Sequence, residues 1–424
     1  MIESPGRTGW RNGIIAAGLL VLAAGLVVWT TFTDLVTVDT LRTSGGRETG
    51  TSRTLGMWGT DTVRIPERPN GTTHDTTMLG LVALAAAALL VICAVLLLIA
   101  RTGRGPGIAR LLTGIATGAT VGMALLVMLL VTFQHSQTNE AMESGSSSSQ
   151  RYEASTGLGL WLLIIAGVAT LAALVLALTG RTAPATETKP GSVGSSVLSG
   201  LLLLAAAGLV IGGSFGALFS FSSERRGSTS GFSRSLWSVT QTSSRGDRTN
   251  EIAQFGVAAI VAAVLLVVAA ALAVLSAYAV SSRQPARSGR LIGTVGFGIL
   301  VATVLTVTVA SIEALVDIAA EDVSPGETVN ASLGLGSYLL FGALVVAVVG
   351  IVFGPRALPV GGPQWTQMPD TPTPPMGVPI TQSDPTQPVV AQPVVAQEDP
   401  PTEPKPEPAP APEQQEPDAT PPRD

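Results

Sequence analysis

Charged residues are scarce in this chain of 424 residues, and their scarcity sets the class of protein. Asp, Glu, Lys and Arg together make up 12% of the sequence, whereas a soluble domain carries about 25%. Aromatic residues reach only 4%, while 46% of the residues are hydrophobic and the mean hydropathy is +0.46. This balance excludes an ordinary soluble globular domain and is typical of a protein that crosses a membrane many times.

Cysteine and histidine are almost missing, which excludes several kinds of site. The single cysteine, Cys93, lies inside an apolar run, so no disulfide within the chain and no cysteine metal cluster is expected. The two histidines, His74 and His135, stand in separate polar stretches, so neither a zinc site nor a catalytic dyad is predicted. No GxxxxGK[ST] phosphate loop and no GxGxxG motif after a strand occurs. The sequence therefore indicates no enzyme activity, no cofactor and no nucleic-acid partner.

Long apolar runs are what the chain has in abundance. A helix needs about 20 apolar residues to cross the hydrocarbon layer. Only helices or closed barrels satisfy backbone hydrogen bonds in lipid, and dense runs without alternation exclude the barrel. The sequence therefore predicts an all-α fold with eight transmembrane helices. They are expected near residues 13–32, 78–100, 111–133, 157–178, 197–219, 252–280, 291–312 and 333–353.

Basic residues in the short connections predict the orientation. Residues 1–12 and the connections 101–110, 181–196 and 281–290 hold ten Arg and Lys residues in short stretches, and such residues are retained in the cytoplasm. The first run resembles a signal peptide but is too long and has no clear cleavage site, so we expect an uncleaved anchor. Arginine outnumbers lysine 22 to 2, and alanine, glycine, valine and leucine dominate the sequence, a composition typical of bacteria with GC-rich genomes. The expected location is the bacterial inner membrane, with both termini cytoplasmic.

An internal repeat organises the predicted spans. The phrase "ASTGLGLWLL" from Ala154 returns as "ASLGLGSYLL" from Ala331, and "SRTL" from Ser52 returns as "SRSL" from Ser233. "ARLLTG" from Ala109 is answered by "GRLIGT" from Gly289. The nearly constant spacing predicts two parallel four-helix units, residues 13–180 and 197–354, joined by a cytoplasmic linker at 181–196. An even number of spans gives both units one orientation.

Small residues in two spans predict helix contacts, because small-xxx-small spacing permits close backbone approach in lipid. The third span carries Gly114, Gly118 and Gly122 at this spacing. The fifth span carries Gly208, Gly212 and Gly216. The predicted role is packing within the bundle, with homodimerisation as the alternative.

Ionisable residues are missing from the centres of all eight predicted spans, which disfavours proton- or ion-coupled transport. Hydroxyls are present at Thr113, Thr117, Thr294, Thr303 and Thr306, and we expect them to bond to helix carbonyls. Glu313, Asp317 and Glu321 recur every four residues at the outer end of the seventh span. Their spacing makes them a candidate cation site, although a solvated acidic helix end is the favoured interpretation, and no metal is predicted.

The polar stretches suggest where partners could bind. The outer connections 33–77 and 220–251 contain Trp58 and Trp237, which suit either a binding surface or the headgroup belt. Residues 355–424 hold 21 of the 29 prolines and ten acidic residues, which predicts a disordered cytoplasmic tail. Such a tail is either an inert tether or a docking segment for a cytoplasmic protein.

The order of spans and loops within each unit resembles claudin-like tetraspan proteins, on the slight match offered by "LGMW" from Leu55 and "SRSLW" from Ser233. The paired loop cysteines of that family are missing, so the resemblance concerns layout alone. By elimination, the sequence predicts a non-enzymatic scaffold or accessory subunit of the cell envelope. The alternative is a permease or channel component for a neutral or lipidic solute.

Overall fold

The structure is a computed structural model that describes most of the chain up to residue 359. The described residues are 5–44, 47–65, 72–99, 106–144, 150–179, 188–189, 193–225, 228–243, 246–251, 255–278, 284–320, 327–354 and 358–359. All of them belong to one compact unit, Met1–Gly361. Of the predicted disordered tail, residues 355–424, only Leu358 and Pro359 are described, and they form a short strand; the rest of the tail lies outside the described residues.

Eight long helices dominate the described part of the chain, and each is long and apolar enough to cross a membrane. The chain is therefore an integral, multi-pass membrane protein, as the sequence predicts. The helices are α1 (Pro5–Thr30), α2 (Leu79–Ile99), α3 (Pro106–Ser144), α4 (Leu158–Thr179), α5 (Val193–Phe215), α6 (Gly256–Tyr278), α7 (Gln284–Ala320) and α8 (Leu335–Phe353).

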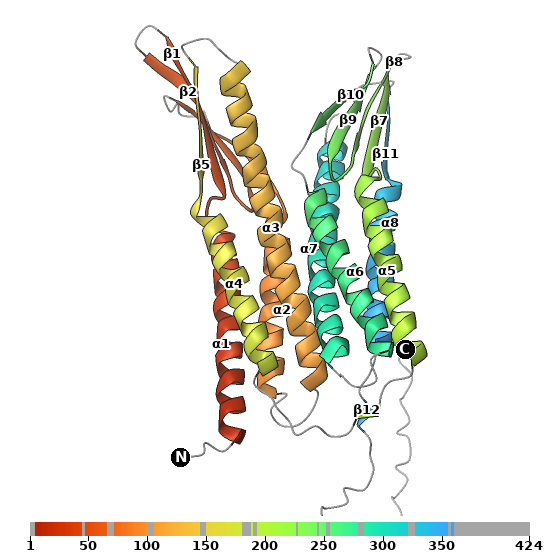
Figure 1. Ribbon diagram of the computed structural model, residues 1–424. Coiled ribbons are helices and arrows are strands. Elements are labelled where there is room, and N and C mark those ends of the chain that lie inside the picture. Colours follow the sequence, from red (N-terminus) through yellow and green to blue (C-terminus); the bar gives the residue numbers. More distant parts are fainter. Residues whose placement is uncertain are drawn as a thin grey trace, which may run out of the picture. The chain divides into compact units, whose positions relative to one another are not determined.

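Two of these helices are much longer than their predicted spans. α3 has 39 residues and α7 has 37, so α3 is about 58 Å long at 1.5 Å per residue. The hydrocarbon layer is only about 30 Å thick. Both helices therefore continue well beyond the apolar runs at 111–133 and 291–312, and Figure 1 shows each rising beside a sheet.

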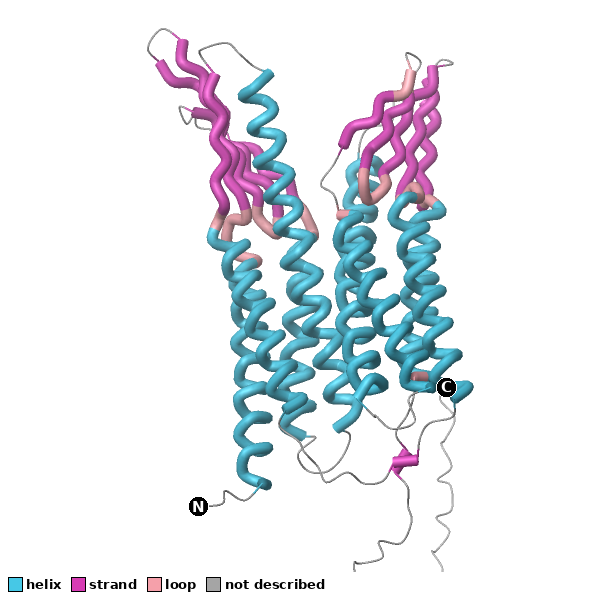
Figure 2. The backbone as a smooth tube through the Cα atoms, in the orientation of Figure 1, coloured by secondary structure: helices cyan, strands magenta, loops and turns pink. Residues whose placement is uncertain are grey.

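The outer connections are folded, which corrects the expected all-α class. β1 (Val36–Ser44), β2 (Arg47–Leu55), β3 (Gly59–Ile65), β4 (Thr72–Thr76) and β5 (Gln150–Thr156) form one sheet in the order β4-β3-β2-β1-β5. β7 (Phe219–Arg225), β8 (Ser228–Arg234), β9 (Ser238–Thr242), β10 (Arg248–Glu251) and β11 (Glu327–Leu333) form a second sheet in the order β10-β9-β8-β7-β11. Each sheet stands at the end of its own helices (Figure 2).

Each sheet joins two outer connections that are far apart in the chain. β5 lies antiparallel to β1, with Val36 opposite Thr156 and Arg42 opposite Gln150. β11 lies in the same way against β7, with Phe219 opposite Leu333. These strands are rich in threonine, serine and valine, and β-branched side chains favour extended backbone. In each half, four strands pair as successive hairpins and a fifth strand pairs with the first of them. This fifth strand, β5 or β11, lies between the third and fourth helices of its half and connects both helices to the sheet.

The apolar core is divided between the two halves. One cluster of buried side chains runs through residues 16–173 and includes Leu20, Leu90 and Leu163. The other runs through residues 203–351 and includes Leu266 and Leu340. The outer helix surfaces remain apolar and exposed, as a bilayer requires; Val168 on α4 is 61% exposed and Val345 on α8 is 64% exposed. α3 and α7 bring the two halves into contact.

A pair of two-residue strands lies at the end of the helices opposite the two five-stranded sheets (Figure 2). β6 (Thr188–Lys189) and β12 (Leu358–Pro359) run antiparallel, with Leu358 opposite Lys189. It joins the stretch predicted as a linker, 181–196, to the residues that follow α8.

Candidate functional site

The contact between the two halves is built on glycines of α3 and α7. A Cβ added to Gly118 would overlap with the carbonyl oxygen of Val295 and would lie 2.9 Å from the Cα of Gly298. A Cβ on Gly298 would in turn lie 2.8 Å from the Cα of Gly118. The two backbones therefore meet directly, and glycine is required at both positions.

The other two predicted glycines of α3 lie on the same contact. A Cβ on Gly114 would overlap with the Thr294 hydroxyl, and one on Gly122 would lie 2.9 Å from the Cα of Ile299. All three glycines thus face α7, on the seam between the halves. Helices in lipid associate through close packing, because lipid gives no hydrophobic driving force for their association.

The glycines of α5 are placed differently from one another. A Cβ on Gly208 would have nothing within 4 Å, and one on Gly212 would only touch Leu339 at 3.7 Å. Gly216 makes a close approach to Gly336 on α8, and Gly213, which the spacing does not single out, packs against Leu340. The close contact with α8 therefore lies at Gly213 and at Gly216, the residue that follows α5.

The two tryptophans sit at matching places in the two halves. A Cβ on Gly80, at the start of α2, would lie 2.5 Å from the Trp58 ring, and a Cβ on Gly256, at the start of α6, would overlap with the Trp237 ring. Trp237 also stacks on Phe215, with ring centroids 5.6 Å apart. Both indoles are half-buried, so each packs a strand turn onto the helix that follows it.

The acidic end of α7 is used in a contact between the halves. The Glu313 carboxylate accepts a hydrogen bond from the backbone N–H of Met78, immediately before α2. A carboxylate in this position suits a helix N-terminus, which carries unpaired N–H groups and partial positive charge. The side chain of Asp317 and the whole of Glu321 lie outside the described residues. No group of three or more potential metal-binding side chains occurs among the residues that the structure describes.

Hydroxyls are the polar groups inside the helical region. Throughout the described ranges, the buried polar side chains are serine or threonine. Thr113, Thr294 and Thr303 donate to carbonyls of their own helices at 2.7–3.0 Å, as the sequence predicts. Thr117 instead donates to the carbonyl of Thr170 on α4 at 3.3 Å.

The remaining sequence candidates lie apart. His74 pairs with Asp61 across the exposed face of the first sheet, and the ring of His135 on α3 lies 3.3 Å from the Thr156 hydroxyl on β5. Cys93 is fully buried in α2. None of these three side chains lies beside another to form a reactive pair among the described residues.

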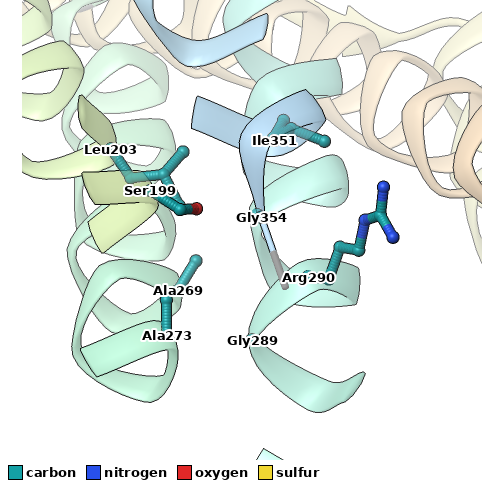
Figure 3. Close-up of a pocket in the computed structure, with 9 residues that line it drawn as sticks. Ser199, Leu203, Ala269, Ala273, Gly289, Arg290, Ile351 and Gly354 are labelled. Carbon is teal, nitrogen blue, oxygen red and sulfur yellow. The ribbon is translucent and has the colours of Figure 1, made fainter. Parts of the chain in front are cut away.

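Two cavities lie in the second half of the protein. The smaller, of about 10 Å³, is lined by α5, α6, α7 and α8 (Figure 3). Ser199 in its wall donates to the Gly350 carbonyl at 2.7 Å, and the Arg290 side chain extends away from it. This volume is at the lower limit for one water molecule, so it is a packing gap.

The larger cavity, of about 190 Å³, lies between the base of the second sheet and α7. Three phenylalanines and Arg234 contribute to its wall, together with Thr306, one of the predicted hydroxyls. Arg234 belongs to the phrase "SRSL", which the sequence marks only as part of the internal repeat. No local sequence pattern marks this cavity. In the structure, Phe232 in its wall packs against Phe219 at a ring-centroid distance of 5.8 Å and against Phe221 at 5.4 Å.

Comparison with known proteins adds no family: the sequence matches no protein-family model and no curated protein.

Proposed function

We propose that this protein is a non-enzymatic scaffold or accessory subunit of a bacterial cell envelope. The observation that carries the proposal is that the outer connections form two five-stranded sheets anchored to membrane helices. Folded sheets offer fixed surfaces to protein partners. In the described helices the fully buried polar residues are serine and threonine, and this supports a structural role over ion-coupled transport.

The proposed architecture is a pair of parallel four-helix units that arose by duplication. Matching hydrogen bonds support it: Leu35 N–H donates to the Leu55 carbonyl at 2.8 Å, and Leu218 N–H donates to the Arg234 carbonyl at 2.7 Å. Trp58 and Trp237 rest on Gly80 and Gly256 in the same way. By these contacts Trp58 corresponds to Trp237, at a spacing of 179 residues. The phrases "SRTL" and "SRSL" are 181 residues apart, two more than this spacing.

The proposed orientation places the sheets outside and the basic connections in the cytoplasm of the inner membrane. The Pro-rich tail, residues 355–424, would then recruit a cytoplasmic protein, and the sheets would engage an envelope partner. The alternative of a permease needs a path for its solute. The direct backbone contact of Gly118 with Gly298 leaves no room for one at that crossing between the halves.

Photo-crosslinking in living cells tests the scaffold proposal. A benzophenone amino acid is placed at Arg64 on β3 or Gln241 on β9, both exposed on the sheets, and at Gln382 in the tail. We expect discrete protein adducts from the sheet positions and a different adduct from the tail. The control is Val345, which faces lipid on α8 and should give no discrete protein adduct.

A second measurement separates the two functions. Purified protein in liposomes should show no solute flux above protein-free liposomes. Flux through the reconstituted protein, together with sheet positions that crosslink no better than Val345, would replace the scaffold by the permease.

A further inference from the structure

The larger cavity lies where the helices give way to the second sheet. Its floor is formed by side chains of α7, including Val307 and Ala310, and its walls by the strands and the turn before α6. Phe219, Phe232 and Phe255 line it. An engineered apolar cavity of about 150 Å³ holds a benzene ring, so about 190 Å³ accommodates part of a hydrocarbon chain.

On α3, the first half has larger side chains at the positions that correspond to the cavity. The match of "ARLLTG" with "GRLIGT" and the mutual contact of Gly118 and Gly298 align α3 with α7 at a spacing of 180 residues. At this spacing the larger side chains Leu126, Leu130 and Val131 stand where the second half has Thr306, Ala310 and Ser311. Leu126 and Val131 are each only 4% exposed. The cavity therefore exists because the second half has smaller side chains on one face of α7.

A positive charge accompanies the missing volume. Arg234 takes the place of Leu55, as their matching backbone hydrogen bonds show. Burial lowers the pKa of the Arg234 guanidinium, and the negative charge of Glu313 opposes that shift. No described residue is hydrogen-bonded to this guanidinium, which has five N–H donors to satisfy. Ser235 and Ser311 add hydroxyls to the same wall.

We propose that this cavity binds an anionic amphiphile, with its acyl chain among the phenylalanines and its carboxylate or phosphate at Arg234. The apolar wall accounts for the chain and excludes a fully polar solute. The guanidinium pairs in two-point fashion with carboxylate or phosphate oxygens. The position of the cavity, between lipid-facing helices and a polar sheet, suits a molecule with both kinds of surface.

Binding of two radiolabelled probes to the purified full-length protein tests this site. The protein is stripped of lipid in a non-ionic detergent and titrated with oleate or with phosphatidylglycerol. We expect saturable binding by the unchanged protein. Oleate binding that phosphatidylglycerol does not displace identifies a free fatty acid as the ligand, and displacement identifies a phospholipid; both outcomes support the site.

Two variants and two controls locate the binding. Ala310→Leu with Ser311→Val introduces the residues that the first half carries, and Arg234→Gln removes the charge. Arg234→Gln should weaken binding by about tenfold or more, since a charge-assisted hydrogen bond contributes at least that factor. The filled variant should weaken binding by about tenfold or more because its larger side chains take up space that the acyl chain would occupy. Arg248→Gln, on exposed β10, makes the same charge change away from the cavity, and Val316→Leu enlarges an exposed side chain of α7; both should bind as the unchanged protein does.

The proposal is overturned if neither probe binds saturably, or if the filled variant binds as well as the unchanged protein. Melting temperatures confirm that each variant is folded. The filled variant decides the question if Arg234→Gln does not fold, because its side chains already pack in the first half.

Discussion

At the scale of single residues, the fold depends on places where a side chain larger than hydrogen would not fit. Glycine spacing alone identifies such places incompletely. Positions four residues apart turn by about 400° in a helix with 3.6 residues per turn, so a row of them drifts around the helix by about 40° per step. In α3 the row stays on the crossing with α7, whereas in α5 Gly208 has left the contact that Gly216 makes.

Gly118→Ala should destabilise the protein strongly. The added methyl group would overlap with the Val295 carbonyl oxygen, so α3 and α7 must separate. Overpacking of this kind costs about 1–3 kcal/mol, and the melting temperature in detergent should fall. Gly208→Ala is the matched control, because nothing lies within 4 Å of its added Cβ and alanine favours a helix. Equal melting temperatures for the two variants would show that the seam is placed wrongly.

The residues around the larger cavity could not be predicted from the sequence. Arg234 and Thr306 are 72 positions apart in the chain, and only the folding of the sheet onto α7 brings them together. The sequence indicates the two tryptophans more clearly than the cavity residues, since each tryptophan follows a copy of the repeated phrase. Their contacts with Gly80 and Gly256 still required the structure, because each pairs a strand turn with a separate helix.

At the scale of elements, the membrane spans could be read directly from the sequence and the sheets could not. Lipid makes apolar length sufficient evidence for a helix. The outer third of α3, from Gln134 to Ser144, is polar and carries no such signal; it is held by packing against β5. Four strands of each sheet pair as successive hairpins, but each sheet is completed by pairing between connections more than 100 residues apart, such as β1 with β5, and this long-range pairing leaves no local pattern.

An engineered disulfide tests the pairing of β5 with β1. Thr37 and Ser155 lie opposite each other, at a Cα separation of about 4.5–5.5 Å that a disulfide bridges. In a Cys93→Ala background, Thr37→Cys with Ser155→Cys should oxidise to a species of altered mobility in a non-reducing gel.

The control keeps the same two strands and shifts the register. Arg151 pairs with Leu41, four positions from Thr37, which places the two Cα atoms more than about 12 Å apart. Thr37→Cys with Arg151→Cys should therefore remain reduced. Oxidation of this pair in place of the first would contradict the register.

At the scale of the whole molecule, the proposed scaffold rests on the proposal that two units lie side by side in one orientation. Each half has its own buried core, so each is a candidate folding unit. The two halves are joined by the contact between α3 and α7. They are also joined by the hydrogen bond from the backbone N–H of Met78, immediately before α2, to Glu313 on α7. With four helices in each half, both sheets belong on the same side of the membrane, where they offer two related but unequal surfaces.

The sequence predicts the number of helices more readily than the function. Spans and repeated phrases are local patterns, whereas partners are recognised by folded surfaces. Where the sequence of the second half departs from the first, at Arg234 and on α7, the structure has a cavity.

Labelling of single cysteines in intact cells tests the architecture most directly. Cysteines are placed in a Cys93→Ala background at Arg64 and Gln241 on the two sheets, at Arg104 in a basic connection and at Arg287 in the first turn of α7. A maleimide that does not cross membranes should label the two sheet positions, and the other two only after the cells are opened. Labelling of Arg104→Cys or Arg287→Cys in intact cells, or labelling of only one sheet, would contradict two parallel units with outward sheets.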